Sequence, residues 1–167
     1  MIFRKLFIRK PDAASRLYAA IVAAARQENF YAEMDVPDTL DGRFDMIVLH
    51  MFLIIDRLKG ESEGFCQRLT DVFFSDLDRT LREMGIGDLS VSRKIRPMAE
   101  AFAGRVKAYA MAIEQGDAAV VQALQRNVYA GDINTKADQL AGWMKDAKAK
   151  LASMTTTKLL DGELDLP

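Results

Sequence analysis

The segment from Met46 to Ile55 reads MIVLHMFLII, and it is apolar at every position except His50. It is about ten residues long, half of the ~20 that a membrane-spanning helix needs. A soluble helix that is apolar on nearly every face must be surrounded by neighbouring helices. We therefore expect this segment to form the central helix of one compact domain.

Around this segment the apolar spacing is helical throughout, and no alternating run is long enough to indicate a strand. We predict an all-α fold of about six helices with a central apolar helix. The expected bounds are 12–31, 39–59, 64–84, 92–115, 117–131 and 135–154. We expect residues 11–154 to form the domain, residues 1–10 a basic amphipathic N-terminal arm, and residues 155–167 a loose C-terminal tail.

The balance of charges and the scarcity of metal ligands exclude several classes of function. Lysine and arginine total 23 against 24 acidic residues, whereas a protein that mainly binds nucleic acid usually has a basic excess. The single cysteine, Cys66, rules out an intramolecular disulfide and a multi-cysteine zinc site. The single histidine, His50, rules out metal binding by two histidines. We therefore expect neither a metal nor a cofactor.

The first ten residues, MIFRKLFIRK, mix cations with apolar side chains. These charges interrupt the apolar stretch of roughly 7–15 residues that a secretory signal requires, so we expect a cytosolic protein. Two interpretations of this arm stay open. Its basic and aromatic residues suit an acidic membrane surface or ribosomal RNA, and the pattern also fits an ordinary first helix or a frayed end.

His50 and Cys66 carry the most reactive side chains of the sequence. A lone histidine in an apolar helix is usually a core residue bonded to a neighbouring carbonyl or carboxylate, and we expect this for His50. A haem or metal role would need a second ligand, and no spacing in the sequence indicates one. The neighbours of Cys66 supply no base to activate a thiol, so we expect a structural cysteine.

The segment SDLDRTLREMGIGD carries closely spaced charges of opposite sign. On a helix, Asp78 lies four residues before Arg82, which is within bonding reach. Arg79 stands in the same relation to Glu83, and Asp76 precedes Arg79 by three residues. Asp76 and Asp78 point to different helix faces, so they do not indicate a pair of catalytic carboxylates. We expect a solvated helix face linked by salt bridges.

Two blocks of sequence can be compared with known families. They read VPDTLDGRFDMIVLHMFLIIDRLKGE and FFSDLDRTLREMGIGDLSVSRKIRPMAEAFAGRVKAY. In this order and at this separation they resemble the ubiquinol–cytochrome c chaperone family, the assembly factors of cytochrome b in the respiratory bc1 complex. The resemblance spans roughly residues 18–128. It implies an all-helical chaperone without catalytic activity, in the bacterial form of the family.

The resemblance also implies a client and its surroundings. The client is newly made cytochrome b, bound until it receives haem. Mitochondrial members of the family act near the ribosomal tunnel exit with a small partner protein, so the partners to be tested are the ribosome, such a small protein and a peripheral membrane surface. The expected location is cytoplasmic or peripheral at the inner membrane. Two rivals stay open: an adaptor that binds the folded bc1 complex, and a small enzyme or haem-handling protein centred on His50.

We assign three groups of residues to these roles. A client-binding apolar groove is expected beside the second and third helices, lined by Phe44, Ile47, Met51, Phe52, Phe73, Phe74 and Met84. A structural polar network is expected from Asp41, Arg43, His50, Asp76, Asp78, Arg82 and Glu83. In it, Arg43 would bond to Asp76 or Asp78 across the helix pair. Contact with ribosomal RNA or acidic lipid is expected from Arg93, Lys94, Arg96, Arg105 and Lys107, with a solvated charged face as the open alternative.

Overall fold

A computed structural model describes residues 11–167, in which eight helices and no strand are present. The helices are α1 Ala13–Ala25, α2 Glu28–Ala32, α3 Leu40–Leu58, α4 Glu63–Glu83, α5 Asp88–Gln115, α6 Asp117–Asn127, α7 Ala137–Ser153 and α8 Thr156–Leu160. The all-α prediction is confirmed, and the six longer helices correspond to the six expected ones. The expected N-terminal arm lies outside the described residues. Within the described range, no helix combines the length and apolar character needed to cross a membrane.

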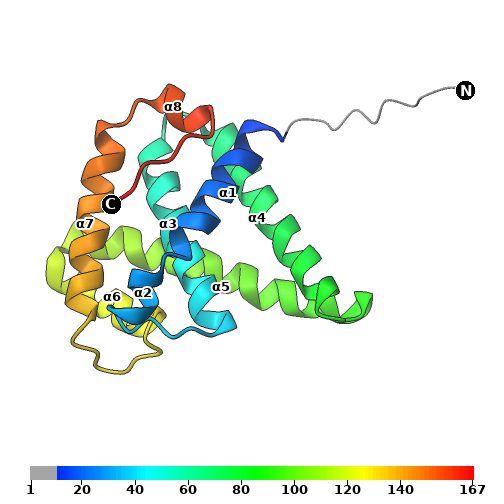
Figure 1. Cartoon of the computed structure of the whole chain (residues 1–167), viewed down its shortest axis with the longest axis horizontal. Helices are drawn as coiled ribbons and strands as arrows, with labels where there is room; N and C mark the ends of the chain where they lie inside the picture. The colour runs from blue at the N-terminus through cyan, green and yellow to red at the C-terminus, as the bar shows by residue number, and fades with distance from the viewer. Residues whose placement is uncertain (1–10) are drawn as a thin grey trace, which may run out of the picture.

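Helix α3 lies at the centre of the molecule, with α1, α5 and α7 packed around it (Figure 1). Its N-cap is Thr39, whose side-chain oxygen accepts a hydrogen bond from the Gly42 amide at 3.1 Å. From Met46 to Ile54 every residue except Ile47 is buried. Burying a large aliphatic side chain contributes about 1.5–3 kcal/mol relative to exposure, so this run of buried residues contributes strongly to the stability of the core.

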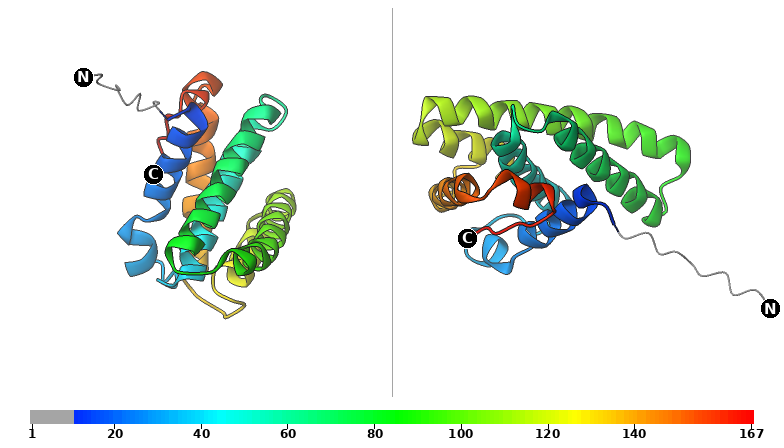
Figure 2. Two further views of the ribbon diagram at one scale, coloured as in Figure 1. Left: turned by 90° about the vertical axis from the view of Figure 1, so that its right-hand side faces the viewer. Right: turned by 90° about the horizontal axis from the view of Figure 1, so that it is seen from above.

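Helices α4 and α5 form a hairpin whose turn stands away from α7 and α8 (Figures 1 and 2). Gly85 ends α4 with a φ of +82°, a conformation that glycine adopts without strain. Helix α5 begins at Asp88 and not at Ser92 as expected. The reason is that the Gly87 carbonyl accepts the amides of Ser90 and Val91, at 2.8 Å and 3.1 Å, and thereby starts the helix four residues earlier.

Pro97 consequently lies inside α5. A proline at this position leaves the carbonyl of Arg93 without its intrahelical donor. Pro97 is exposed, so water can reach this part of the helix.

The first predicted helix is divided into α1 and α2 at Gln27, whose backbone is extended. The hydroxyl of Tyr31 donates a hydrogen bond to the Ala25 carbonyl at 2.8 Å and holds the two pieces together. The break places Phe30 in the core, where its ring contacts those of His50 and Trp143.

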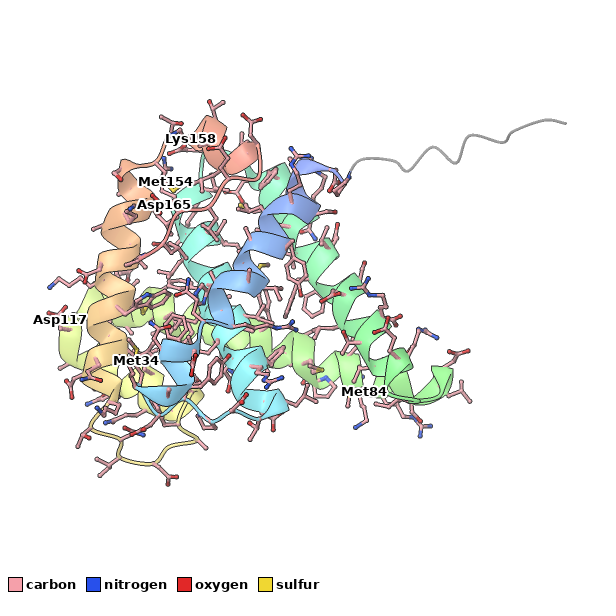
Figure 3. All side chains as sticks on the ribbon, in the orientation of Figure 1. Met34, Met84, Asp117, Met154, Lys158 and Asp165 are labelled. Atoms are coloured by element: carbon pink, nitrogen blue, oxygen red, sulfur yellow. The ribbon has the colours of Figure 1, made fainter. Side chains whose placement is uncertain are left out.

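The last thirteen residues are not a loose tail. They contain α8, and Figure 3 shows Lys158 and Asp165 close to the end of α7. Leu159 is fully buried, and the Asp161 carbonyl accepts a hydrogen bond from the Arg16 guanidinium at 2.8 Å. The indole of Trp143 donates to the Pro167 carbonyl at 3.2 Å. The C-terminal segment therefore closes over α1 and α7.

Candidate functional site

A cleft of about 720 Å³ opens where the first turns of α3 meet the middle of α5 and the end of α6. Its walls include apolar side chains from three helices and the preceding loop: Pro37, Leu40, Phe44, Leu81, Pro97, Met98 and Ala101. Leu40 is 54% exposed, which is unusual for a large aliphatic residue beside a cleft. The cleft thus offers apolar surface that no part of residues 11–167 covers.

The sequence D-T-L-D-G-R-F shapes one wall of this cleft. A Cβ atom at Gly42 would lie 2.0 Å from the Pro37 carbonyl oxygen, so only glycine fits this first turn of α3. The Thr39 amide donates to the same carbonyl at 2.9 Å. These contacts fold the loop tightly against the start of α3 and direct Leu40 and Phe44 toward the cleft.

An ion pair between α3 and α5 forms the inner end of the cleft. Arg105 Nη2 lies 2.7 Å from Asp45 Oδ1, with side chains that are 22% and 8% exposed. Burial raises the pKa of Asp45 to about 7, although the Arg105 guanidinium opposes the shift. The guanidinium carbon also lies 5.5 Å from the centre of the Phe44 ring, a cation–π arrangement. Arg105 is thus held from two sides.

Three further cations stand on the rim of the cleft. Arg93, Lys94 and Arg126 are exposed, and none has an ion-pair partner among residues 11–167. The lining as a whole contains four cations and two carboxylates, Asp41 and Asp45. The cleft therefore carries a positive charge in a chain whose net charge is −1.

The seven apolar residues expected to bind a client do not line one groove. Met51, Phe52 and Phe73 are at most 1% exposed, and Phe44 is 8% exposed. The ring of Phe73 in α4 stacks on that of Phe44 in α3 and so joins the two helices. It also contacts the ring of Phe74. Ile47 and Phe74 are half-buried, whereas Met84 is 57% exposed at the hairpin turn (Figure 3). Of the seven, only Phe44 lines the cleft, and Leu40, Leu81 and Met98 are lining residues that sequence reasoning missed.

The expected bridge from Arg43 to Asp76 or Asp78 is absent in the described residues, and this prediction is wrong. Arg43 pairs instead with Asp38, at 2.7 Å, just before α3. Both side chains are more than half exposed, so the contact is a surface pair within one local segment.

The charges of α4 pair along the helix, as the spacing predicts. Asp78 lies 2.6 Å from Arg82, and Asp76 is paired with Arg79. Arg79 also reaches Glu83 at 4.0 Å. Each of these pairs is exposed on at least one side. They stabilise the hairpin locally and supply no catalytic arrangement.

Two members of the polar set make contacts between helices. Arg82 also pairs with Asp88 across the hairpin turn. Asp76 accepts a hydrogen bond from the Tyr18 hydroxyl at 2.9 Å, which ties α4 to α1. Asp41 is exposed at the cleft and makes no ion pair within the described range.

His50 is a core residue, as expected. Its Nδ1 lies 2.8 Å from the Met46 carbonyl, which can only accept, so Nδ1 carries the proton. The ring contacts Phe30 and Trp143, and burial lowers the pKa of His50 to about 4. Cys66 is buried as well, and burial raises the pKa of its thiol. Neither side chain is placed for nucleophilic or acid–base chemistry, and residues 11–167 hold no cluster of potential metal ligands.

The five cations expected to form one basic surface are separated. Arg93 and Lys94 lie on the cleft rim, and Arg105 is held in its ion pair. Arg96 pairs with Glu100 at 3.3 Å. Lys107 faces a different groove, between α5 and α6. Arg126 of α6 lines the cleft together with Arg93 and Lys94 of α5. The sequence did not indicate this, because the three residues belong to two different helices.

Comparisons with known proteins agree with this architecture. The sequence matches the family model described as ubiquinol-cytochrome C chaperone over residues 32–166, a range that contains the whole cleft. The structure is similar to a crystal structure of the Cbp3 homolog from Brucella abortus, with a TM-score of 0.82 and 37% sequence identity. That similarity covers 93% of this chain and 88% of the Brucella chain.

Curated relatives show sequence similarity to a shorter part of the chain. The ubiquinol-cytochrome-c reductase complex assembly factor 1 of Xenopus laevis is 27% identical over 119 residues, which cover 70% of this chain and 60% of the relative. The human protein of that name is 24% identical over 120 residues, 70% of this chain and 40% of the relative. The chain thus spans less than two thirds of the length of these relatives. Since the family match extends over most of the described domain, the chain belongs to the ubiquinol-cytochrome c chaperone family.

Proposed function

We propose that this protein is a non-enzymatic chaperone for assembly of the bc1 complex, and that its client is newly made cytochrome b. The observation that carries the proposal is the family match over residues 32–166. The assembly factors among its relatives are named for the ubiquinol-cytochrome c reductase complex. We place the activity in the cytoplasm or at the inner membrane surface.

The physical chemistry of such a client supports a binding role for the cleft. A membrane protein exposes apolar helices before insertion, and these aggregate in water unless they are covered. A concave surface with apolar walls can cover a short part of such a helix. The exposed side chain of Leu40 is suited to this contact, and the half-buried Met98 lines the same cleft, whereas the half-buried Phe74 and Ile47 do not.

The burial of His50 counts against an enzyme. A catalytic histidine needs a polar cleft and a second group within hydrogen-bond reach. His50 instead bonds only to a backbone carbonyl between two aromatic rings.

The remaining expected partners stay proposals. The ribosomal tunnel exit, a small partner protein and an acidic membrane surface are compatible with a chaperone that acts during synthesis. Of the basic residues assigned to RNA or lipid contact, only Arg93, Lys94 and Lys107 are exposed without an ion-pair partner in the described range.

Site-specific photo-crosslinking in growing cells tests the proposal. A photoreactive residue would replace Met98 at the cleft and, in a matched control, Met111, which is 48% exposed and faces the groove between α5 and α6. We expect cytochrome b to be captured from position 98 and not from position 111, and the capture to disappear when translation is halted. Capture of only the mature complex would favour the adaptor. Recovery of no bc1 subunit would overturn the proposal.

A further inference from the structure

We infer that the cleft between α3, α5 and α6 takes an apolar segment of a partner protein that carries acidic side chains. The inference deepens the proposed function by giving the chemistry of the segment that docks there. It rests on the charge of the lining, the shape of the cleft and the position of Arg105 at its inner end.

Charge complementarity is the first argument. Asp45 is already paired with Arg105, which leaves Asp41 as the other carboxylate against Arg93, Lys94 and Arg126. Residues 1–10, which lie outside the described range, contain no acidic side chain that could neutralise these cations. A docking segment with carboxylates would do so, and charge matching of this kind chiefly sets specificity and the rate of association.

The interior of the cleft gives the second argument. Arg105 Nε is buried and has no hydrogen-bond partner, although the Asp45 carboxylate lies beside the same guanidinium. A guanidinium has several donors in a fixed plane and binds a second oxygen readily. The Arg105 side chain lines the cleft and is 22% exposed, so a carboxylate or a backbone carbonyl of the docking segment can approach the part of it that is accessible.

The shape of the cleft favours a protein segment over RNA or lipid. The cations stand around apolar walls formed by Leu40, Phe44 and Met98, and not on an open face that could follow a phosphate backbone. A bilayer surface is flat, whereas this surface is concave. The larger groove between α1 and α4, about 930 Å³, contains the acidic residues Asp71, Asp76 and Glu83 together with two arginines, so it lacks a comparable positive charge.

Two designed peptides test the inference with the purified full-length protein. Both are amphipathic helices of about 18 residues with the same leucine and alanine face, and the polar face carries glutamate in one and lysine in the other. Binding is followed by the NMR signals of the isotope-labelled protein. We expect the glutamate peptide to bind about tenfold more tightly and to shift signals of Leu40, Phe44 and Met98.

Charge reversal at the rim provides the decisive comparison. The triple variant Arg93→Glu, Lys94→Glu, Arg126→Glu should lose about tenfold in affinity for the glutamate peptide and gain affinity for the lysine peptide. A matched control reverses three exposed cations away from the cleft, Lys59, Arg68 and Lys158, and should keep the original preference.

Other outcomes would overturn the inference. Equal binding of both peptides, or shifts confined to residues outside the cleft, would remove the acidic segment as the occupant. Binding of a short RNA or of anionic vesicles that depends on the same three cations, without peptide binding, would reassign the rim to that ligand. Because the peptides contain no cytochrome b sequence, their failure would leave the crosslinking result, and hence the proposed function, intact.

Discussion

The middle and the first turns of helix α3 differ in the contacts that their polar groups make. In the buried middle part, from Met46 to Ile54, the only titratable side chain is His50, which bonds within the helix and lies among aromatic rings. In the first turns, Asp45 reaches across to Arg105, and exposed side chains such as Leu40 border an open cleft. The middle of this helix thus forms the centre of the core, and its first turns form a wall of the candidate binding site.

The difference teaches where a substitution should affect stability and where it should affect binding. We call residues 46–54 of α3 and the side chains packed on them the sealed part. A side chain there is closely packed, so its loss leaves a cavity. The open end has fewer neighbours, and its charges are partly solvated. Four predictions, taken from the largest expected effect to the smallest, test this contrast.

Phe73→Ala should have the largest effect. The Phe73 ring is fully buried and contacts the rings of Tyr18, Phe44 and Phe102. We expect a loss of about 3–5 kcal/mol in the free energy of unfolding, measured in denaturant. Met84→Ala, at an exposed position, is the control and should change little. A similar cost at both positions would mean that the Phe73 ring is no more closely packed than the exposed Met84 side chain.

His50 should make the sealed part sensitive to acid. Its pKa is lowered to about 4 by burial, from an ordinary value of 6.5, so its contribution is complete above pH 6.5 and is lost as the pH falls through 4. The difference in pKa corresponds to about 3 kcal/mol. His50→Asn, which cannot titrate, should lose correspondingly less stability between pH 7 and pH 4. Parallel pH profiles of the two proteins would contradict this prediction.

Arg105→Leu should destabilise the open end mainly at high pH. The pKa of Asp45 is raised to about 7, so in the folded protein its carboxyl group is largely protonated at pH 5 and charged at pH 8. Without Arg105 the charged form loses its partner, and we expect a cost of about 2 kcal/mol at pH 8, less than for a fully buried pair because Arg105 is partly solvated. At pH 5 the cost should be much smaller.

The control for this pH dependence is Arg96→Leu. Arg96 and Glu100 are 84% and 69% exposed, so breaking this pair should produce no measurable pH dependence. Urea unfolding at both pH values measures all three proteins. An Arg105 variant with the same cost at pH 5 and pH 8 would show that packing, and not the ion pair, is what Arg105 supplies.

Two glycine substitutions have opposite expected signs. Gly42→Ala forces a Cβ atom against the Pro37 carbonyl and should cost about 1–2 kcal/mol. Gly104→Ala lies within α5, where nothing approaches within 4 Å, and should stabilise the protein by about 0.5–1 kcal/mol. Thermal unfolding compares the two. Stabilisation by both substitutions would show that the loop before α3 yields easily and does not hold the cleft wall.

Local patterns predicted the helices and the pairs along them. The spacing of apolar residues is set within a few turns, as are the pairs of Asp78 with Arg82 and of Arg79 with Glu83. The early start of α5 escaped prediction because a backbone carbonyl, that of Gly87, initiates the helix before the Ser92 side chain could. The order of the C-terminal segment escaped it too, since that order depends on distant Arg16 and Trp143.

The candidate site was largely hidden from the sequence. An apolar residue such as Phe44 or Phe73 produces the same sequence pattern whether it lies in the core or lines a groove. Only the packing of the helices decides which of the two positions it takes. Arg43 was paired with the wrong acid because a nearer one, Asp38, satisfies it locally. The sequence did not indicate that Arg126 lies on the cleft rim, because its neighbours there come from another helix.

The sequence by itself determined the all-helical class, the central position of α3 and the buried state of His50. These follow from side chains that repeat along one helix, and helix geometry turns such spacing directly into faces. Only the tertiary structure decided that Asp45 meets Arg105, that Leu40 stays uncovered and that three cations surround the cleft. Those contacts join residues many turns apart, and the angle at which two packed helices cross is fixed by all of their interface side chains together.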